Sequence, residues 1–319
     1  MAAILDTNAG DGKAMNASAT PVLSIVIPAW NEARRVPQSL LQIRDYFNSH
    51  PLDVEILLMV ERSQDDTLDR AGAVVEGDTR FHVIDNLVHR GKGYAVRSGV
   101  LRARGDIVLF MDADLSTPLE EVQAFLAHFQ QQPDTDVLIG SRALARSRVE
   151  KPQSALRRNM GRIFNALVQT LSVPGITDTQ CGFKAFRRDA ARAIFSRQTL
   201  DGFAFDVEVL MLARALDMRV DVLPVRWLNS PDSSVHIVRD SWRMFRDLLR
   251  VRARVRRTLR RQPVGADPFV GAGLPANRPE SDPYSSVERT ITPGRAAVMA
   301  PSSSTASPAT NTWAAPSAY

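Results

Sequence analysis

The chain has 319 residues, enough for one large domain or two small ones, and its 44% hydrophobic content is ordinary for a globular core. Its net charge of +5 comes from one segment, since residues 241–261 hold nine Arg against one Asp, whereas residues 1–240 carry a net charge of −2. This distribution argues against nucleic-acid binding by the whole fold. The single cysteine excludes an internal disulfide and fits a reducing compartment, and no apolar run approaches the ~20 residues of a membrane-spanning helix.

Residues 1–20 are small and polar, lack the basic start and apolar centre of a signal peptide, and are expected to be disordered. From residue 21 to about 240, strand-like apolar runs alternate with helical patterns, which predicts one α/β domain with a single Rossmann-like central sheet and helices on both faces. The first five predicted strands span 23–28, 54–60, 81–85, 107–111 and 137–140. The helices between them are predicted near 33–48, 65–77, 92–103 and 118–131.

After residue 140 the pattern predicts a basic loop, a helix near 157–171, a strand near 183–187, a helix near 203–216 and a strand near 220–225. Three helix starts also carry capping signals. Thr117, followed by Pro118, predicts the start of the fourth helix. Asn31 is the expected cap of the first helix, and Ser63 or Asp65 that of the second.

Residues 241–261 are predicted to form a basic amphipathic helix. An apolar stripe at helical spacing is shared by Trp242, Phe245, Leu249 and Leu259, with Val255 beside it. Such a helix suits an anionic membrane surface. The alternative is that the apolar stripe packs on the domain and the arginines lie in solvent. A nucleic-acid-binding arm is disfavoured because the segment lacks other recognition motifs. Residues 262–319, which hold nine of the 19 prolines, are expected to be disordered.

Two carboxylates, Asp112 and Asp114, directly follow the apolar run that ends at Met111. Open α/β sheets bind ligands at the carboxyl ends of their strands. Mg²⁺ and Mn²⁺ prefer oxygen ligands and commonly bridge carboxylates to substrate phosphates. The motif therefore predicts a metal site, with a solvated turn as the alternative, since Asp is common in turns.

Polar residues also follow the first two strands, at 28–32 (P-A-W-N-E) and 61–67 (E-R-S-Q-D-D-T). Residues 89–93 (H-R-G-K-G) precede a helix. Their two glycines permit close backbone approach, and Lys92 adds a point charge suited to a nucleotide or phosphate. A glycine-rich turn without function explains this last motif equally well.

Basic residues follow the fifth strand. Arg142 belongs to a G-S-R motif, and Arg157 and Arg158 open a later predicted helix. Their guanidinium groups could hold a diphosphate or an acceptor phosphate with paired hydrogen bonds, or they could be solvated. Residues 178–184 (D-T-Q-C-G-F-K) form a polar loop whose chemistry the spacing does not reveal, and Cys181 is expected to be a small buried residue rather than a nucleophile.

Together these motifs resemble those of the family 2 glycosyltransferases, which have the GT-A nucleotide-diphospho-sugar transferase fold. The motifs P-A-W-N-E, G-K-G, D-A-D and G-S-R occur in the family's order, and the resemblance covers residues 22–240. Four longer pieces are most similar to the polyprenyl-phosphate hexose synthases, above all the dolichyl-phosphate β-glucosyltransferases: R-G-K-G-Y-A-V-R, D-A-D-L-S-T-P, D-T-Q-C-G-F-K and F-D-V-E-V-L. The resemblance implies a catalytic domain over residues 21–240.

The resemblance also implies roles for the matching positions. The nucleoside pocket would be lined by Pro28, Trp30 and Glu32, with Glu61 near the base or ribose and Lys92 near the nucleotide. Mg²⁺ or Mn²⁺ on the donor diphosphate would be held by Asp112 and Asp114. Phosphates would be steadied by Arg142 and by Arg157 or Arg158. The sugar or acceptor would be surrounded by Gln180, Asp206 and Glu208. The implied catalytic residues are Asp114, Arg142 and Asp206.

The chain departs from the family pattern in three ways. The usual D-D-G-S after the second strand is V-E-R-S here, which puts base selectivity in doubt. Ser116 stands where mannose synthases tend to have Gln, which favours UDP-glucose over GDP-mannose as the donor. The eukaryotic glucosyltransferases begin with a membrane-spanning helix, which is absent here, so membrane contact is expected from residues 241–261.

The predicted function is metal-dependent, inverting transfer of a hexose to a polyprenyl phosphate such as dolichyl phosphate, by a cytoplasmic enzyme associated peripherally with an anionic membrane. A phosphate acceptor is already ionised near pH 7, so it needs positioning arginines more than a general base. A hydroxyl acceptor would need a base, and Asp206 is the candidate. The alternatives are a soluble acceptor and a non-catalytic nucleotide-sugar sensor, against which the intact D-A-D motif argues.

Overall fold

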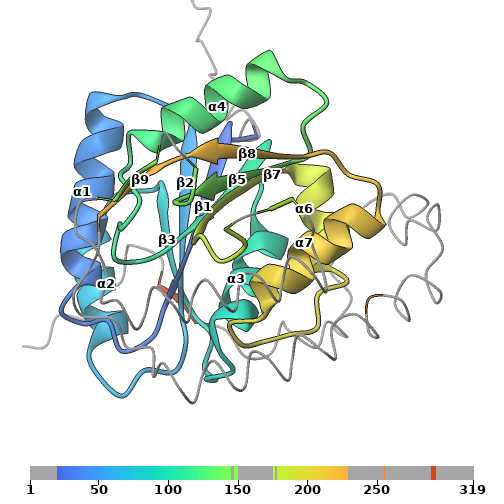
Figure 1. Ribbon diagram of the computed structural model, residues 1–319. Coiled ribbons are helices and arrows are strands. Elements are labelled where there is room, and N and C mark those ends of the chain that lie inside the picture. Colours follow the sequence, from blue (N-terminus) through green and yellow to red (C-terminus); the bar gives the residue numbers. More distant parts are fainter. Residues whose placement is uncertain are drawn as a thin grey trace, which may run out of the picture.

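The computed structural model describes residues 20–144, 147–149, 175–176, 178–228, 255 and 289–291 (Figure 1). In this part of the chain, eight strands form one sheet in the order β10-β3-β2-β1-β4-β7-β5-β8. Their bounds are β1 Leu23–Ala29, β2 Val54–Val60, β3 Phe81–Asp85, β4 Ile107–Met111, β5 Val137–Ser141, β7 Phe183–Arg187, β8 Val220–Pro224 and β10 Arg289–Ile291. A separate parallel pair is formed by β6 (Arg148–Val149) and β9 (Arg226–Trp227).

Strand direction changes inside the sheet. Strands β3, β2, β1 and β4 are parallel neighbours, and so are β5 and β8. Strand β7 lies between β4 and β5 and is antiparallel to both, with Phe183 opposite Met111. The loop that leads into β7 therefore meets the edge at which β4 ends.

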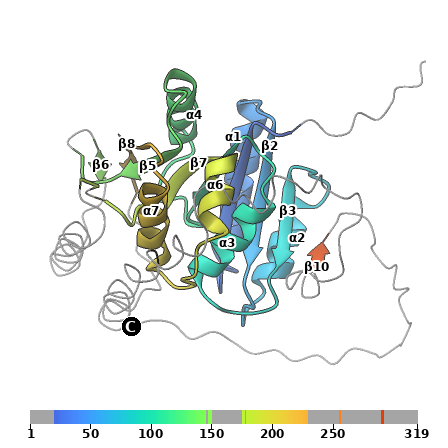
Figure 2. The same ribbon diagram turned by 90° about the vertical axis from the view of Figure 1, so that its right-hand side faces the viewer.

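Helices cover both faces of the sheet (Figures 1 and 2). One face carries α1 (Val36–Ser49), α2 (Thr67–Val75) and α4 (Glu121–Gln131). The other carries α3 (Lys92–Arg102), α6 (Arg188–Phe195) and α7 (Phe205–Ala215). Alternate residues of β1 serve the two cores: Ile25 and Ile27 pack toward α1, and Val26 packs toward α3. The predicted α/β class with helices on both faces is confirmed.

Two predicted helix caps are wrong. Helix α4 begins at Glu121, three residues after Pro118, and the Thr117 hydroxyl is buried without a hydrogen-bond partner among the described residues. Helix α1 begins at Val36, and the side-chain oxygen of Asn31 instead accepts the N–H of Gln64 at 2.7 Å. Short turns intervene between each polar signal and its helix.

The predicted cap of α2 is also wrong: the N-cap residue is Asp66, which makes no side-chain cap hydrogen bond, and Asp65, one residue earlier, accepts the N–H of Thr67 at 3.1 Å. Helix α6 was not predicted: it follows β7 without a break, so its pattern merged with that of the strand. The predicted helix near 157–171 and residues 1–19, 262–288 and 292–319 lie outside the described residues, as does all of 241–261 except Val255. Residues 289–291 belong to the tail that is expected to be disordered, but they form β10 and pair with β3.

Val255 is 5% exposed and belongs to the core cluster that contains α7. This single position agrees with the alternative in which part of the segment packs on the domain. Among the described residues, no helix combines the length and apolar character needed to cross a membrane.

Candidate active site

Polar residues from four strands meet at one edge of the sheet. Strands β1, β2 and β4 end there, and the antiparallel β7 begins there because Phe183 pairs with Met111. Asp112 and Asp114 follow β4, and the loop 178–182 leads into β7 at their side. The topology thus brings two motifs together that are separated by more than 60 residues in the sequence.

Asp112 is held on both sides of its carboxylate. Its Oδ1 lies 2.6 Å from the Lys92 ammonium, at the start of α3. Its Oδ2 packs against Gly182, where any side chain would overlap the carboxylate. Burial alone would lower the pKa of Lys92, but the neighbouring carboxylates, led by Asp112, outweigh burial and raise it. Lys92 therefore stays charged beside the predicted metal ligand.

Asp114 is positioned by its own turn, since its Oδ1 accepts the N–H of Ser116 at 3.0 Å. Leu115 between them has φ 49°, a conformation that only a tight turn would impose on a leucine. Burial, reinforced by Asp114 among other carboxylates, raises the pKa of Glu32 although Arg35 lies 3.3 Å away. Glu32 and the D-A-D motif consequently form one region of negative potential.

The two carboxylates of the D-A-D motif suit a divalent cation that is also bound by substrate phosphates and water. The residues described contain no group of three or more His, Cys, Asp or Glu side chains able to hold a metal alone. Mg²⁺ usually binds through one or two carboxylates, together with substrate phosphates and water. Asp112 and Asp114 match that requirement, and the glycine at 182 leaves the Asp112 carboxylate unobstructed by a side chain.

Arg142 is locked to the loop that leads into β7. Its Nε and Nη2 donate to Asp178 at 2.8 and 2.7 Å, and its guanidinium lies 4.7 Å from the centroid of the Trp227 ring. Burial would raise the pKa of Asp178, but the hydrogen bonds and charge of Arg142 prevail and lower it. Arg142 is therefore a fixed cation at the site's edge.

A third ion pair of the site lies in the protein interior. Lys184 is 0% exposed, donates to the carbonyl of Cys181 at 2.7 Å and forms a salt bridge with Asp206 on α7. Its ammonium lies 5.1 Å from the centroid of the Phe110 ring. The predicted catalytic carboxylate Asp206 is thus already matched by a positive charge.

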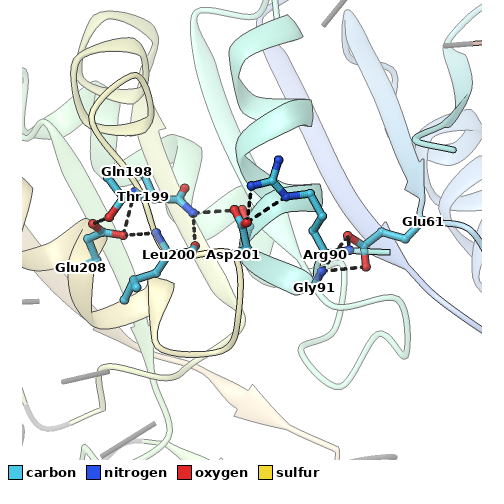
Figure 3. Close-up of polar contacts among 9 residues, drawn as sticks. Glu61, Arg90, Gly91, Gln198, Thr199, Leu200, Asp201 and Glu208 are labelled. Carbon is cyan, nitrogen blue, oxygen red and sulfur yellow. Dashed lines mark hydrogen bonds and ion pairs between the residues drawn. The ribbon is translucent and has the colours of Figure 1, made fainter. Parts of the chain in front are cut away.

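Glu61 supports a turn. Its carboxylate accepts the N–H groups of Arg90 and Gly91 at 3.1 and 2.9 Å (Figure 3). It also bonds to His89 Nδ1 at 2.6 Å. The His89 ring in turn stacks on Trp30, with ring centroids 4.1 Å apart. Glu61 is 2% exposed, so it orders the residues that surround the expected nucleoside pocket.

Glu208 has a similar supporting task. It accepts hydrogen bonds from Thr199 and from the N–H of Leu200, and thereby holds the loop between α6 and α7 (Figure 3). That loop reaches the 89–93 turn, where Asp201 accepts two hydrogen bonds from Arg90 at 2.6 and 2.9 Å. Glu61 therefore holds the 89–93 turn, and Glu208 holds the loop that contacts this turn.

The glycines of the 89–93 turn serve this contact between loops. Gly91 has φ 124°, and a side chain there would strike the Asp201 carbonyl. A side chain at Gly93 would strike the Leu200 carbonyl at 2.5 Å. The close backbone approach expected of these glycines is therefore made by the protein's own 200–205 segment.

The structure brings most of the predicted site residues to one region. Asp112, Asp114, Lys92, Arg142 and Asp206 are linked directly or through shared electrostatic contacts. Pro28 and Trp30 belong to the end of β1 or directly follow it, and Gln180 lies half-buried in the loop before β7. Arg157 and Arg158 lie outside the described residues.

Sequence reasoning missed four contributors, namely His89, Asp178, Lys184 and Trp227. Three of them stand inside motifs that had been singled out, so the signal was present. Their partners are distant in the sequence, and only the fold reveals them. Cys181 is buried as expected, and burial raises the pKa of its thiol to about 12, which makes it a poor nucleophile.

Comparison with known proteins shows the family to which the chain belongs. Residues 24–195 match glycosyl transferase family 2. The dolichyl-phosphate beta-glucosyltransferase of Dictyostelium discoideum is 33% identical over 242 residues, which cover 73% of this chain and 74% of the relative. The Homo sapiens protein of the same name is 32% identical over 74% of this chain and 76% of its own length.

Solved structures with the same fold are more distant in sequence. Mannosyl-3-phosphoglycerate synthase from Rubrobacter xylanophilus superposes with a TM-score of 0.56 at 21% identity, over 76% of this chain and 75% of the other. Glucosyl-3-phosphoglycerate synthase from Mycobacterium tuberculosis gives 0.53 at 17% identity, over 74% and 80%, in a complex with Mn²⁺, UDP-glucose and phosphoglyceric acid. These neighbours establish a GT-A fold.

Proposed function

Because the chain belongs to glycosyl transferase family 2, and is thus a glycosyltransferase, we propose that it transfers glucose from UDP-glucose to a polyprenyl phosphate with inversion at the sugar carbon. The observation that carries the proposal is the convergence of Asp112, Asp114 and Lys92 at the carboxyl edge of the sheet. The names of the two relatives described above support both the sugar and the acceptor.

The proposed reaction is a displacement. An acceptor phosphate oxygen attacks the anomeric carbon of glucose as the bond to the UDP oxygen breaks, so UDP leaves with the electron pair. Bound Mg²⁺ or Mn²⁺, held by Asp112 and Asp114, would neutralise charge that grows on that leaving diphosphate. Lys92 supplies a further positive charge beside Asp112. Trp30, stacked on His89, offers an aromatic surface for the uracil ring.

The state of Asp206 favours a phosphate acceptor over a hydroxyl. A general base must accept a proton, and Asp206 is paired with the buried ammonium of Lys184. Asp206 is also 3% exposed, so its carboxylate is not available to an acceptor hydroxyl. An ionised phosphate needs no base, only cations that position it, and Arg142 is a fixed cation at the edge of the site.

A soluble acceptor is the second candidate. The structural neighbours named above are phosphoglycerate-glycosylating enzymes, so this fold accommodates small anionic acceptors. A third possibility, a donor that is GDP-mannose, is disfavoured by Ser116 and by the glucosyltransferase names of the relatives.

The test is an assay of the purified full chain with radiolabelled UDP-glucose or GDP-mannose, a polyprenyl phosphate or 3-phosphoglycerate, and either Mn²⁺ or EDTA. We expect label from UDP-glucose to enter the organic phase only with polyprenyl phosphate and metal. Label in the aqueous product would support the soluble acceptor, and full transfer in EDTA would contradict the metal site.

Membrane contact forms the last part of the proposal, with residues 241–261 as the contact segment and its arginines facing anionic headgroups. Sedimentation with anionic and neutral vesicles should show binding of the full chain to anionic vesicles at low salt, and less binding of a chain that ends at Asp240. Because truncation also removes the buried Val255, circular dichroism must first show that the shorter chain is folded. Equal binding by the two chains would refute the role of the segment.

A further inference from the structure

Lys92 and Asp112 form a direct ion pair at the proposed metal site. The ammonium lies 2.6 Å from Oδ1 of Asp112, and the two side chains are only 18% and 30% exposed. The pair is thus partly shielded from water, where a charge–charge contact is stronger than at an open surface. One of the carboxylate oxygens proposed to bind metal is therefore already engaged.

The surrounding charges explain why Lys92 rests there. Asp206 is matched by Lys184, and Glu32 by Arg35, so these two acids have cations of their own. Asp112 has Lys92, and Asp114 also acts on the Lys92 charge. Arg142 also acts on Asp112 through its charge but is hydrogen-bonded to Asp178, so Lys92 is the cation in direct contact with the D-A-D motif.

The position of Lys92 in α3 is otherwise unfavourable. It is the first residue of the helix, next to Gly91, where the helix dipole is positive and favours negative groups. A lysine at this position is stabilised only if an anion lies beside it. Asp112 supplies that anion in the absence of substrate, and a diphosphate is a second anion of suitable charge.

We propose that Lys92 is a stand-in cation: it neutralises Asp112 while the donor is absent and moves to the donor diphosphate when a divalent metal takes its place. This inference rests on the proposed function. Without nucleotide, the ammonium repels an incoming metal and occupies one of its ligands. With nucleotide, the diphosphate attracts the ammonium and frees the carboxylate, so the metal and the donor bind together.

The experiment separates metal binding from nucleotide binding in the full chain. Mn²⁺ is titrated without nucleotide and followed by electron paramagnetic resonance, and UDP is titrated without metal by calorimetry. For Lys92→Met we expect Mn²⁺ alone to bind about tenfold tighter, because removing one positive charge near a metal ion is worth about that much even in a high dielectric. UDP alone should bind several-fold weaker, because a cation for its diphosphate is lost.

Opposite changes in the two affinities are diagnostic, because damage to the fold would weaken both. Lys92→Arg keeps the charge and should leave the Mn²⁺ affinity close to that of the unchanged protein. Arg102→Met removes one positive charge from the far end of the same helix, where Arg102 bonds to the Ser98 carbonyl, and should change neither affinity. Lys92→Gln serves as a second neutral variant if Lys92→Met does not fold.

Two negative results have different meanings. If Mn²⁺ alone binds equally well to the unchanged protein and to both neutral variants, the stand-in role of Lys92 is refuted while the transferase proposal stands. If UDP does not bind to the unchanged protein even at saturating Mn²⁺, the proposed function fails, and the inference fails with it.

Discussion

At the scale of single residues, the site separates carboxylates that are available to a ligand from carboxylates that hold the protein together. Asp112 and Asp114 lie half-buried at a strand end. Glu61 and Glu208 are almost fully buried, and their oxygens accept hydrogen bonds from backbone N–H groups and from the side chains of His89 and Thr199. A buried carboxylate without partners would be costly, so these bonds explain why acids are tolerated there.

Asp114→Asn should abolish hexose transfer while leaving the free energy of unfolding within about 0.5 kcal/mol. The amide oxygen can still accept the Ser116 N–H and keep the turn, but the charge that binds metal is lost. Turnover and urea denaturation measure the two effects. Asp134→Asn, in an exposed turn, is the matched control and should transfer normally. Near-normal transfer by Asp114→Asn would exclude it as a metal ligand.

Lys184→Met should destabilise the fold by about 3–5 kcal/mol, because Asp206 would be left as an unpaired buried charge. The double variant with Asp206→Leu should recover most of that loss, since an apolar pair of similar volume suits the interior. Urea denaturation of the single and double variants forms a double-mutant cycle. If Lys184→Met and the double variant are equally stable, the loss of the Lys184 charge does not act on stability through Asp206.

At the scale of elements, two loops on neighbouring parts of the sheet edge act as one unit. The 89–93 turn and the 198–202 loop are joined by Arg90 and Asp201 and braced by Glu61 and Glu208 (Figure 3). Helix α3, which carries Lys92, starts from the first loop. The position of the Lys92 charge thus depends on a contact more than 100 residues away in the sequence.

Gly93→Ala tests that dependence. The new methyl group would meet the Leu200 carbonyl at 2.5 Å, so the loops must separate, at a cost of about 1–3 kcal/mol. We expect a lower melting temperature and weaker UDP binding. Gly202→Ala is the matched control, because a side chain there has nothing within 4 Å and the backbone needs no left-handed conformation. If both variants behave alike, the loop contact does not position Lys92.

At the scale of the whole molecule, folding shifts the pKa values of several groups. Most of these shifts change the stability of the protein in the same direction as the pH falls. Hydrogen bonds and neighbouring cations overcome burial and lower the pKa of several carboxyl groups, as for Asp178 beside Arg142. Burial lowers the pKa of His82 below 6.5. In both cases the unfolded chain binds protons more readily than the folded one, so stability falls as the pH falls.

We therefore expect the free energy of unfolding to be constant near pH 7–8 and to decline in two steps on acidification. The first step begins below about 6.5, where unfolded His82 takes up a proton, and the second lies near and below about 4, where carboxyl groups such as Asp178 are protonated. Glu32, whose pKa is raised mainly by burial, opposes the second step slightly. Urea denaturation across pH 3–8 measures the profile.

His82→Asn should remove the first step, while His50→Gln, at an exposed position, should leave it in place. A profile that rises on acidification would contradict the assigned direction of these pKa shifts.

The fold class, the main strands and the D-A-D motif at the end of β4 could be predicted from the amino-acid sequence, because apolar periodicity and strand-end carboxylates are local properties of the chain. Which of the acids face a ligand depends on contacts that form in the folded protein. Glu61 and Asp206 look like ligand-binding groups in the sequence, yet their oxygens are engaged by Gly91 and Lys184. Hydrogen bonds and ion pairs between distant residues depend on strand order, and no local pattern encodes the antiparallel β7 that brings Lys184 beneath the site.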